Sequence, residues 1–218
     1  MVAVARSSSS KSVRTPLQAR SARTQERILA AVEKLLETTP FEKITVADIV
    51  RHAKSSVGSF YARFADKEAL LDALYQRYDA QLGARIDRVK AEDLRALPFE
   101  ERAAAFVKFK LQMFRERQWL LRALGLHSRA HPERVLDEDL LERRAQKLKR
   151  VASMFDDCHD QIGHPDPERA IGFAIFAVSA VFRDKIIFPG PHAEVTEASD
   201  AELLQEATRM FLGYLKGA

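Results

Sequence analysis

The stretch TVADIVRHAKSSVGSFYARF, residues 45–64, contains two short helical patterns separated by a polar break. Its first residue, Thr45, is a good N-cap, and Asp48 three positions later approximates a capping box. A helix is therefore expected from Thr45 to about Ala53, and Lys54-Ser-Ser ends it.

The second pattern predicts a helix over residues 57–64 that buries Val57, Phe60 and Phe64. The residues between these three must face outward, and they are small, hydroxylated or cationic: Gly58, Ser59, Tyr61, Ala62 and Arg63. A surface helix with a purely structural role more often carries Glu and Lys. Two short helices joined by a brief turn fit a helix-turn-helix, whose second helix enters the DNA major groove.

Helical patterns flank this pair on both sides. The preceding one starts near Thr24 and ends at Thr38-Thr-Pro40, because proline disfavours helix in the residue before it. The following one opens at the cap Asp66 and runs for about 24 residues, roughly 35 Å. The chain thus predicts a three-helix head and a long fourth helix. The apolar face of the first helix is Ile28, Leu29, Val32, Leu35 and Leu36.

Basic residues are concentrated toward the N-terminus. Residues 1–64 contain eleven Lys and Arg against five Asp and Glu, whereas residues 65–218 contain 24 against 26. A basic head on a near-neutral body is the charge distribution expected of a nucleic-acid binder. Residues 1–22, rich in Ser, Arg and Ala, predict a disordered basic tail. Its cations either follow DNA phosphates or are simply solvated.

The rest of the chain also predicts helices, separated by proline-containing loops. They are expected at about residues 99–115, 119–130, 133–158, 167–187 and 199–216. No stretch alternates convincingly with the period of two that a half-buried strand requires. The expected fold is all-α, with about nine helices in total.

Composition places the chain among soluble proteins. Apolar residues make up 46% of the 218, which is enough for a buried core. The single cysteine, Cys158, excludes an intramolecular disulfide and fits a reducing compartment. The longest apolar stretch, Ala170–Val181, is shorter than the roughly 20 residues of a membrane span. The N-terminus lacks the apolar core of a signal peptide. We therefore expect a cytoplasmic protein without membrane contact.

Three segments resemble the DNA-binding head of TetR-family regulators: Ile44-Thr-Val-Ala-Asp-Ile-Val50, Val57-Gly-Ser-Phe-Tyr-Ala-Arg-Phe64 and Asp66-Lys-Glu-Ala-Leu-Leu71. The match covers about residues 24–75, a third of the chain. Members of this family are all-α homodimers with an N-terminal DNA-binding head and a C-terminal ligand-binding body, and most act as repressors. The resemblance implies the same layout here.

This layout gives three predicted parts: a basic tail over residues 1–22, a helix-turn-helix domain over residues 23–68, and a ligand-binding and dimerisation domain over residues 69–218. It implies that the protein binds a palindromic operator in double-stranded DNA and that a small apolar effector releases it. Whether binding represses or activates stays open at this point, as do the effector, the operator and the target genes.

The resemblance also implies roles for single residues. Thr45 would cap the second helix and give its hydroxyl to a phosphate, and Tyr61 and Lys67 would contact the phosphate backbone. Charge alone adds Lys43 and Arg63. The complete predicted interface is Lys43, Thr45, Lys54, Ser55, Ser56, Val57, Gly58, Ser59, Tyr61, Arg63 and Lys67.

Three positions depart from the family pattern. Lys54 stands where the turn usually has glycine, Ser55 replaces an apolar anchor, and Ala62 replaces a histidine. A non-glycine residue in a left-handed turn costs about 1 kcal/mol. The departures fall where base contacts are set, so the pattern does not predict the sequence preference. Whether Lys54 adds a phosphate contact stays open at this point.

The last two expected helices, residues 167–187 and 199–216, correspond to the pair through which the family dimerises. The first is apolar nearly all round, which is typical of a helix covered on both sides. Burial within one monomer is the alternative. The candidate effector pocket is lined by residues that at helical spacing are otherwise simple core: Phe106, Phe109, Met113, Phe114, Trp119, His127, Phe155 and Phe173.

Two other classes of protein remain as alternatives, an enzyme in a helical bundle and a protein-interaction module with a basic tail. His127 and His131 stand at i, i+4, and Cys158-His159 lies near His164, but none of these sets has a third metal ligand at a convincing spacing. Adjacent cysteine and histidine on a helix point about 100° apart, which is unsuitable for a nucleophile and its base. We expect no cofactor, no metal and no catalytic residues.

Overall fold

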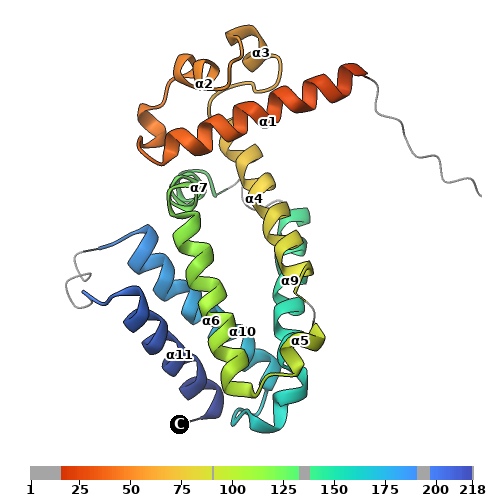
Figure 1. The fold of residues 1–218 in the computed structure, drawn as a ribbon, viewed down its shortest axis with the longest axis vertical. Helices are drawn as coiled ribbons and strands as arrows, with labels where there is room; N and C mark the ends of the chain where they lie inside the picture. Colours follow the sequence, from red (N-terminus) through yellow and green to blue (C-terminus); the bar gives the residue numbers. More distant parts are fainter. Residues whose placement is uncertain (1–15, 90, 133–137, 191–196, 218) are drawn as a thin grey trace, which may run out of the picture. The chain divides into compact units, whose positions relative to one another are not determined.

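The computed structural model describes residues 16–89, 91–132, 138–190 and 197–217 (Figure 1). Within these ranges the chain forms ten α-helices and no strand, so the expected all-α class is confirmed and the expected count of nine is one too few. The chain divides into two compact units, residues 1–67 and 68–218. The division lies one residue before the boundary expected between head and body.

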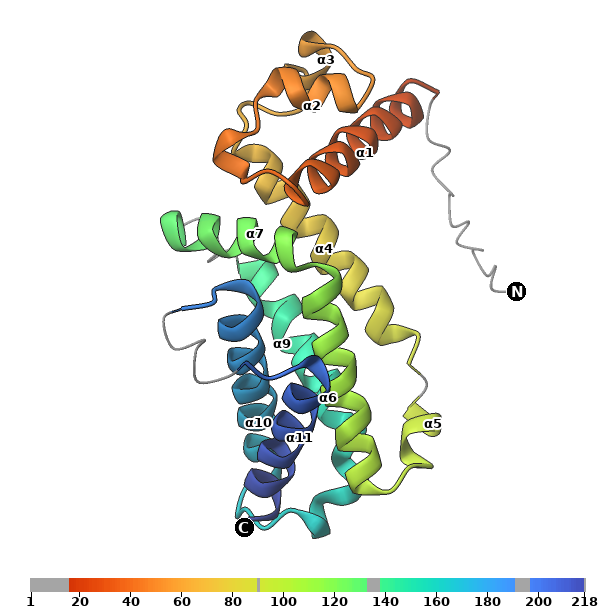
Figure 2. The same cartoon turned by 60° about the vertical axis from the view of Figure 1, so that its left-hand side comes forward.

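Unit 1 consists of three helices and one short turn of 3-10 helix (Figures 1 and 2). They are α1 (Pro16–Leu36), η1 (Phe41–Lys43), α2 (Val46–His52) and α3 (Val57–Tyr61). The predicted apolar face of α1 is largely buried, with Ile28, Leu29, Val32 and Leu36 at most 5% exposed. α1 begins well before Thr24, so residues 16–22 are helical and do not belong to a disordered tail; residues 1–15 lie outside the described residues.

The start of α2 is fixed by the predicted capping box. The Thr45 hydroxyl accepts a hydrogen bond from the Asp48 amide at 3.1 Å, and the Asp48 carboxylate accepts one from the Thr45 amide at 3.2 Å. The Thr45 hydroxyl, which donates to the Asp48 carboxylate at 2.6 Å, and the Thr45 amide lower the pKa of Asp48 below its ordinary value. The box satisfies two of the helix's otherwise unpaired amides, which explains why a seven-residue helix begins so sharply.

Unit 2 contains seven α-helices among the described residues, with two further helical turns. They are α4 (Ala69–Asp87), α5 (Ala91–Arg95), α6 (Phe99–Glu116), α7 (Gln118–Ala130), α9 (Glu138–Ala152), the 3-10 segment η2 (Ser153–Gln161), α10 (Pro167–Phe182), the π-helical turn η3 (Arg183–Ile187) and α11 (Asp200–Lys216).

These bounds correct several expectations. α4 starts after Glu68 and not at the predicted cap Asp66, and α5 was not predicted. The helix expected over residues 133–158 changes to 3-10 geometry after Ala152, and its first residues, 133–137, lie outside the described residues. The change of geometry brings Met154 and Phe155 into the core, where both are at most 9% exposed.

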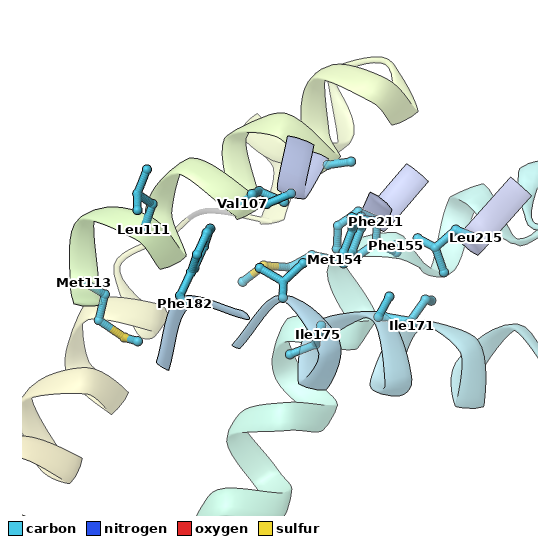
Figure 3. Packing of buried hydrophobic residues seen from close by; sticks show 14 of the residues in the cluster. Val107, Leu111, Met113, Met154, Phe155, Ile171, Ile175, Phe182, Phe211 and Leu215 are labelled. Carbon is cyan, nitrogen blue, oxygen red and sulfur yellow. The ribbon is translucent and has the colours of Figure 1, made fainter. Parts of the chain in front are cut away.

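The core of unit 2 lies where α6, α10 and α11 run side by side (Figure 2). Figure 3 shows Val107 of α6, Phe155 of η2, Phe182 of α10 and Phe211 of α11 directed into this cluster. Fully burying such side chains contributes about 1.5–3 kcal/mol each. α10 is nevertheless not covered all round within the monomer, a point that bears on assembly below. No helix of the described ranges is long and apolar enough to cross a membrane.

Candidate nucleic-acid interface

The turn between α2 and α3 is a Schellman motif, a helix ending in which a left-handed residue reverses the chain. The Ser55 amide donates to the Val50 carbonyl at 2.9 Å, and the Lys54 amide donates to the Arg51 carbonyl at 3.2 Å. Lys54 has φ = 48° and, within the described residues, is the sole non-glycine residue with positive φ. Its left-handed backbone costs about 1 kcal/mol relative to glycine. The turn thus places the positive charge of Lys54 at a position where the family pattern usually has glycine.

α3 presents a small and open surface. Ser56 caps it by accepting a hydrogen bond from the Ser59 amide at 3.1 Å. Val57 is 49% exposed and Tyr61 56% exposed, one helical turn apart, and a methyl group added at Gly58 would meet nothing within 4 Å. The expectation that Val57 is buried is therefore wrong. It is the first residue of the helix and points away from the core that Phe60 and Phe64 fill, as Tyr61 does.

A polar groove of about 480 Å³ lies beside the turn, between α1 and α3. Four cations line it, and no carboxylate does. Five hydroxyl-bearing side chains complete the lining. The residues are Arg20, Ser21, Thr24, Arg27, Lys54, Ser55, Ser56, Ser59 and Arg63.

The α1 side of this groove was missed from the sequence, apart from Arg20, which the sequence placed in the tail. Arg20, Thr24 and Arg27 stand at i, i+4 and i+7, so they share one face of α1. The same rule that marked the apolar face of the helix would have shown this polar face. The tail boundary expected at residue 22 hid it, because half of the pattern fell outside the predicted helix.

Arg63 holds the two sides of the groove together. Its guanidinium donates to the Ser59 carbonyl at 2.6 Å, and to the carbonyl and hydroxyl of Ser21 in α1 at 3.3 Å each. An arginine has five N–H donors, so further donors remain for an anion in the groove. Arg63 thus both positions α3 against α1 and contributes charge.

Lys67 contacts the backbone of this chain. Its ammonium donates to three backbone carbonyls of the segment before α2, those of Phe41, Glu42 and Ile44, at 3.1, 3.4 and 3.3 Å. It also lies 4.6 Å from the centre of the Phe41 ring. An ammonium has three donors. All three are directed at carbonyls of this chain, so Lys67 stabilises the entry to α2, and its phosphate contact stays a prediction.

The remaining predicted residues are accessible. Lys43 and Thr45 are exposed at the start of α2, Ser56 and Gly58 are exposed on the turn and α3, and Ser55 is partly buried in the groove. The structure thus gathers eight of the eleven predicted residues around the turn and α3, with Lys43, Thr45 and Lys67 beside the entry to α2. Exposed cations and hydroxyls without a competing carboxylate are the chemistry that contacts phosphate.

Residues 28–74 match the family model described as "Bacterial regulatory proteins, tetR family". This segment is a TetR-family DNA-binding domain. The matched segment contains α2, the strained turn and α3. One curated relative, the HTH-type transcriptional regulator EthR of Mycolicibacterium smegmatis, is 37% identical over 93 residues. That alignment covers 38% of this chain and 43% of EthR, so it spans less than half of the relative's length.

Solved structures of TetR-family regulators share the fold over almost the whole chain. A putative TetR-family transcriptional regulator from Mesorhizobium loti matches with a TM-score of 0.70 at 20% identity, covering 90% of this chain and 96% of its own. FadR from Bacillus subtilis, solved in complex with stearoyl-CoA, matches with a TM-score of 0.60 at 14% identity, covering 88% and 98%. At these identities the likeness concerns the fold alone.

In unit 2, the eight residues predicted to line a pocket separate into two groups. Phe106, Phe109, Met113 and Phe155 line two adjoining cavities between α4, α6 and α9. The other four lie outside both cavities: Phe114 is buried in the core, Trp119 and Phe173 are 47% and 52% exposed, and His127 bonds Asp72 of α4 at 3.0 Å. Their aromatic character gave no sign of which helix face they occupy.

Among the described residues, the histidines and the cysteine do not gather into one metal-binding cluster. The rings of His127 and His131 are 5.0 Å apart on α7, whereas the His164 ring accepts a hydrogen bond from the Asp166 amide at 3.0 Å. Cys158 is buried, and burial raises the pKa of its thiol. In the part of the chain that the structure describes, no group of three or more His, Cys, Asp or Glu side chains is placed to hold a metal ion.

Proposed function

We propose that the protein is a sequence-specific regulator of transcription that binds double-stranded DNA through α3 and the groove beside it. The observation that carries the proposal is the groove itself, with four cations, five hydroxyl-bearing residues and no carboxylate. Such a surface attracts the phosphate backbone, and phosphate contacts fix how a recognition helix is seated. α3 is short and projects small side chains, which suits close approach to base edges.

Contacts to phosphates and contacts to bases would be made by different residues. Arg20, Arg27 and Lys54 would bind phosphates, and the exposed hydroxyl of Tyr61 would add a further backbone contact. Val57 and Gly58 would face the bases, where the methyl groups of Val57 suit the methyl group of thymine. Val57, which the sequence predicted to be buried, would therefore face the bases.

The proposal includes a homodimer formed through α10 and α11. Each helix leaves aromatic or apolar side chains exposed: Phe173 and Phe176 are 52% and 59% exposed, and Met210 and Tyr214 are 38% exposed each. The rings of Phe173 and Tyr214 lie 5.1 Å apart, so the two helices contribute to one continuous patch. An exposed aromatic patch of this kind is typical of protein–protein contacts. A second copy of the chain would cover it.

A dimer has a mechanical consequence for DNA binding. Two recognition helices must meet successive major grooves about 34–36 Å apart, so the operator would be palindromic. A small ligand that binds one arrangement of the dimer better than another would change DNA affinity by population shift. We propose that the protein is a repressor, acting in the cytoplasm, that an apolar effector releases from its operator.

Footprinting on the DNA flanking the protein's own gene tests the proposal. We expect a protected palindrome whose half-sites are about one helical turn apart, bound at least 10³-fold more tightly than bulk DNA. Tyr61→Phe should weaken binding to every sequence, whereas Val57→Ala should change the preferred base. If no fragment is bound more tightly than bulk DNA, the proposed function is wrong.

A further inference from the structure

Two adjoining cavities lie between α4, α6 and α9 in unit 2. Their volumes are about 200 Å³ and 150 Å³, and they share four lining residues, so together they form one candidate ligand space. Aromatic and aliphatic side chains make up most of the lining. The shared residues are Ile86, Phe106, Phe109 and Val151.

The charged residues of this lining are all cations. Arg102 lines the first cavity, and Lys110 and Lys147 line the second, whereas no aspartate or glutamate lines either. Two of the three cations have a carboxylate partner outside the lining. Arg102 pairs with Asp157 at 2.5 Å, and Lys147 pairs with Asp79 of α4.

Lys110 differs from the other two. Among the described residues it forms no ion pair and no hydrogen bond; its contact with the Phe114 ring, 5.5 Å from the ring centre, is its nearest stabilising interaction. Burial, with no other contribution, lowers the pKa of Lys110 to about 8. A desolvated ammonium without a counter-ion is unfavourable, and a neighbouring anion would relieve that cost.

We infer that this space binds an apolar molecule bearing one carboxylate, and that the Lys110 ammonium is the charge partner of that carboxylate. The inference rests on the proposed function only in taking the space to be the effector site. The aliphatic and aromatic lining would hold the body of the ligand, and Lys110 of α6 lines the second cavity together with Met113.

A neutral apolar ligand fits the observations less well. It would fill the space but leave Lys110 desolvated and without an anion, so part of the favourable free energy of binding would be lost. A dicarboxylate fits less well too, because Arg102 and Lys147 already have carboxylate partners. The charge of the lining, beyond what the protein itself neutralises, is that of one lysine.

Calorimetric titration of the full-length protein with matched probes tests the inference. The probes are hexanoate, octanoate and decanoate, each compared with the alcohol of the same chain length. We expect the carboxylate to bind about tenfold more tightly than its alcohol, the usual contribution of a charge-assisted hydrogen bond. Lys110→Met should remove that preference and Lys110→Arg should retain it. Lys108→Met, on the exposed face of the same helix, is the control and should change nothing.

Two outcomes of the titration would contradict the inference. If the acid is not preferred at any chain length, or if Lys110→Met retains the preference, the inference is wrong. Thermal unfolding of each variant shows whether it is folded, and Lys110→Met is expected to be at least as stable as the parent because it removes a desolvated charge. DNA takes no part in the titration, so failure of the regulator proposal in footprinting and failure of the ligand inference are distinguishable.

Discussion

The two units use their cations in opposite ways. In unit 1, Arg20, Arg27 and Lys54 line a surface groove that contains no carboxylate. In unit 2, Arg102 is 2% exposed, and both terminal nitrogens of its guanidinium donate hydrogen bonds within the protein. It pairs with Asp157 and donates to the carbonyls of Met154, Arg95 and Leu97 at 2.8, 3.1 and 3.1 Å.

The comparison separates cations that stabilise the fold from cations that are available to bind an anion. A cation whose donors are used by the protein stabilises the fold, and Lys67 belongs with Arg102 in that group although it lies in the DNA-binding head. A cation with no carboxylate nearby is available to an anion from outside. On this basis we propose that the groove of unit 1 binds phosphate and that Lys110 binds a small carboxylate.

Removing Arg102 should have the largest effect on stability. Arg102→Met removes a donor from three carbonyls and the ion-pair partner from Asp157, so we expect the free energy of unfolding to fall by about 2–3 kcal/mol. The control is Arg209→Met, which breaks an exposed pair with Glu206 and should cost less than about 0.5 kcal/mol. Urea denaturation measures both. Equal losses would contradict the distinction between the two kinds of cation.

The exposed aromatic patch of unit 2 should govern assembly rather than stability. Phe176→Glu places a charge in the proposed dimer interface, so the dimer dissociation constant should rise about a hundredfold. Sedimentation velocity over a range of concentrations measures this. Leu141→Glu adds the same charge at another exposed apolar residue, on α9, and should leave the dimer unchanged. A Phe176→Glu protein that stays dimeric would locate the interface elsewhere.

Lys54→Gly should have opposite effects on stability and on DNA binding. Lys54→Gly relieves the left-handed strain of the turn and should stabilise the head by up to about 1 kcal/mol, less the larger chain entropy of glycine. The same change removes a groove cation and should weaken DNA binding severalfold. Thermal unfolding and fluorescence anisotropy measure the two effects. If both rise together, Lys54 contributes nothing to DNA binding.

The pair between Arg102 and Asp157 should also give a small pH dependence. The Arg102 guanidinium holds the pKa of Asp157 below its ordinary value of 3.8. Because the folded-state pKa is the lower one, the stabilisation is complete above about pH 5 and is lost as the pH falls below 4. Asp157 is partly exposed, so solvent screening keeps the effect small. Asp157→Asn should therefore flatten the acid side of the stability profile between pH 5 and 3.

Local rules predicted the parts of the head that depend on neighbours in sequence. The capping box of Thr45 and Asp48 follows from residue type and spacing, whereas the left-handed turn at Lys54 follows from the family resemblance; the structure contains both. Periodicity likewise indicated α6, α10 and α11 to within a few residues. It gave α4 too early a start because Asp66 is a good cap residue that the helix does not use.

Features that depend on tertiary contacts could not be predicted in this way. Whether Lys67 meets a phosphate or three carbonyls is decided by residues more than twenty positions away. The exposure of Phe173 and the burial of Phe155 are set by which helices cover them, and aromatic residues at helical spacing look alike in both cases. The same holds for Lys110, whose missing counter-ion is a property of the folded lining.

The salt dependence of DNA binding tests directly whether the groove between α1 and α3 binds DNA phosphates. On a fragment from the flanking DNA, the slope of log affinity against log salt concentration should become shallower by about 1 in Arg27→Gln, because one phosphate contact is lost. Lys34→Gln removes the same charge from α1 outside the groove, where Lys34 pairs with Glu37, and should keep the parent slope. Equal slopes for all three proteins would contradict a phosphate-binding groove between α1 and α3.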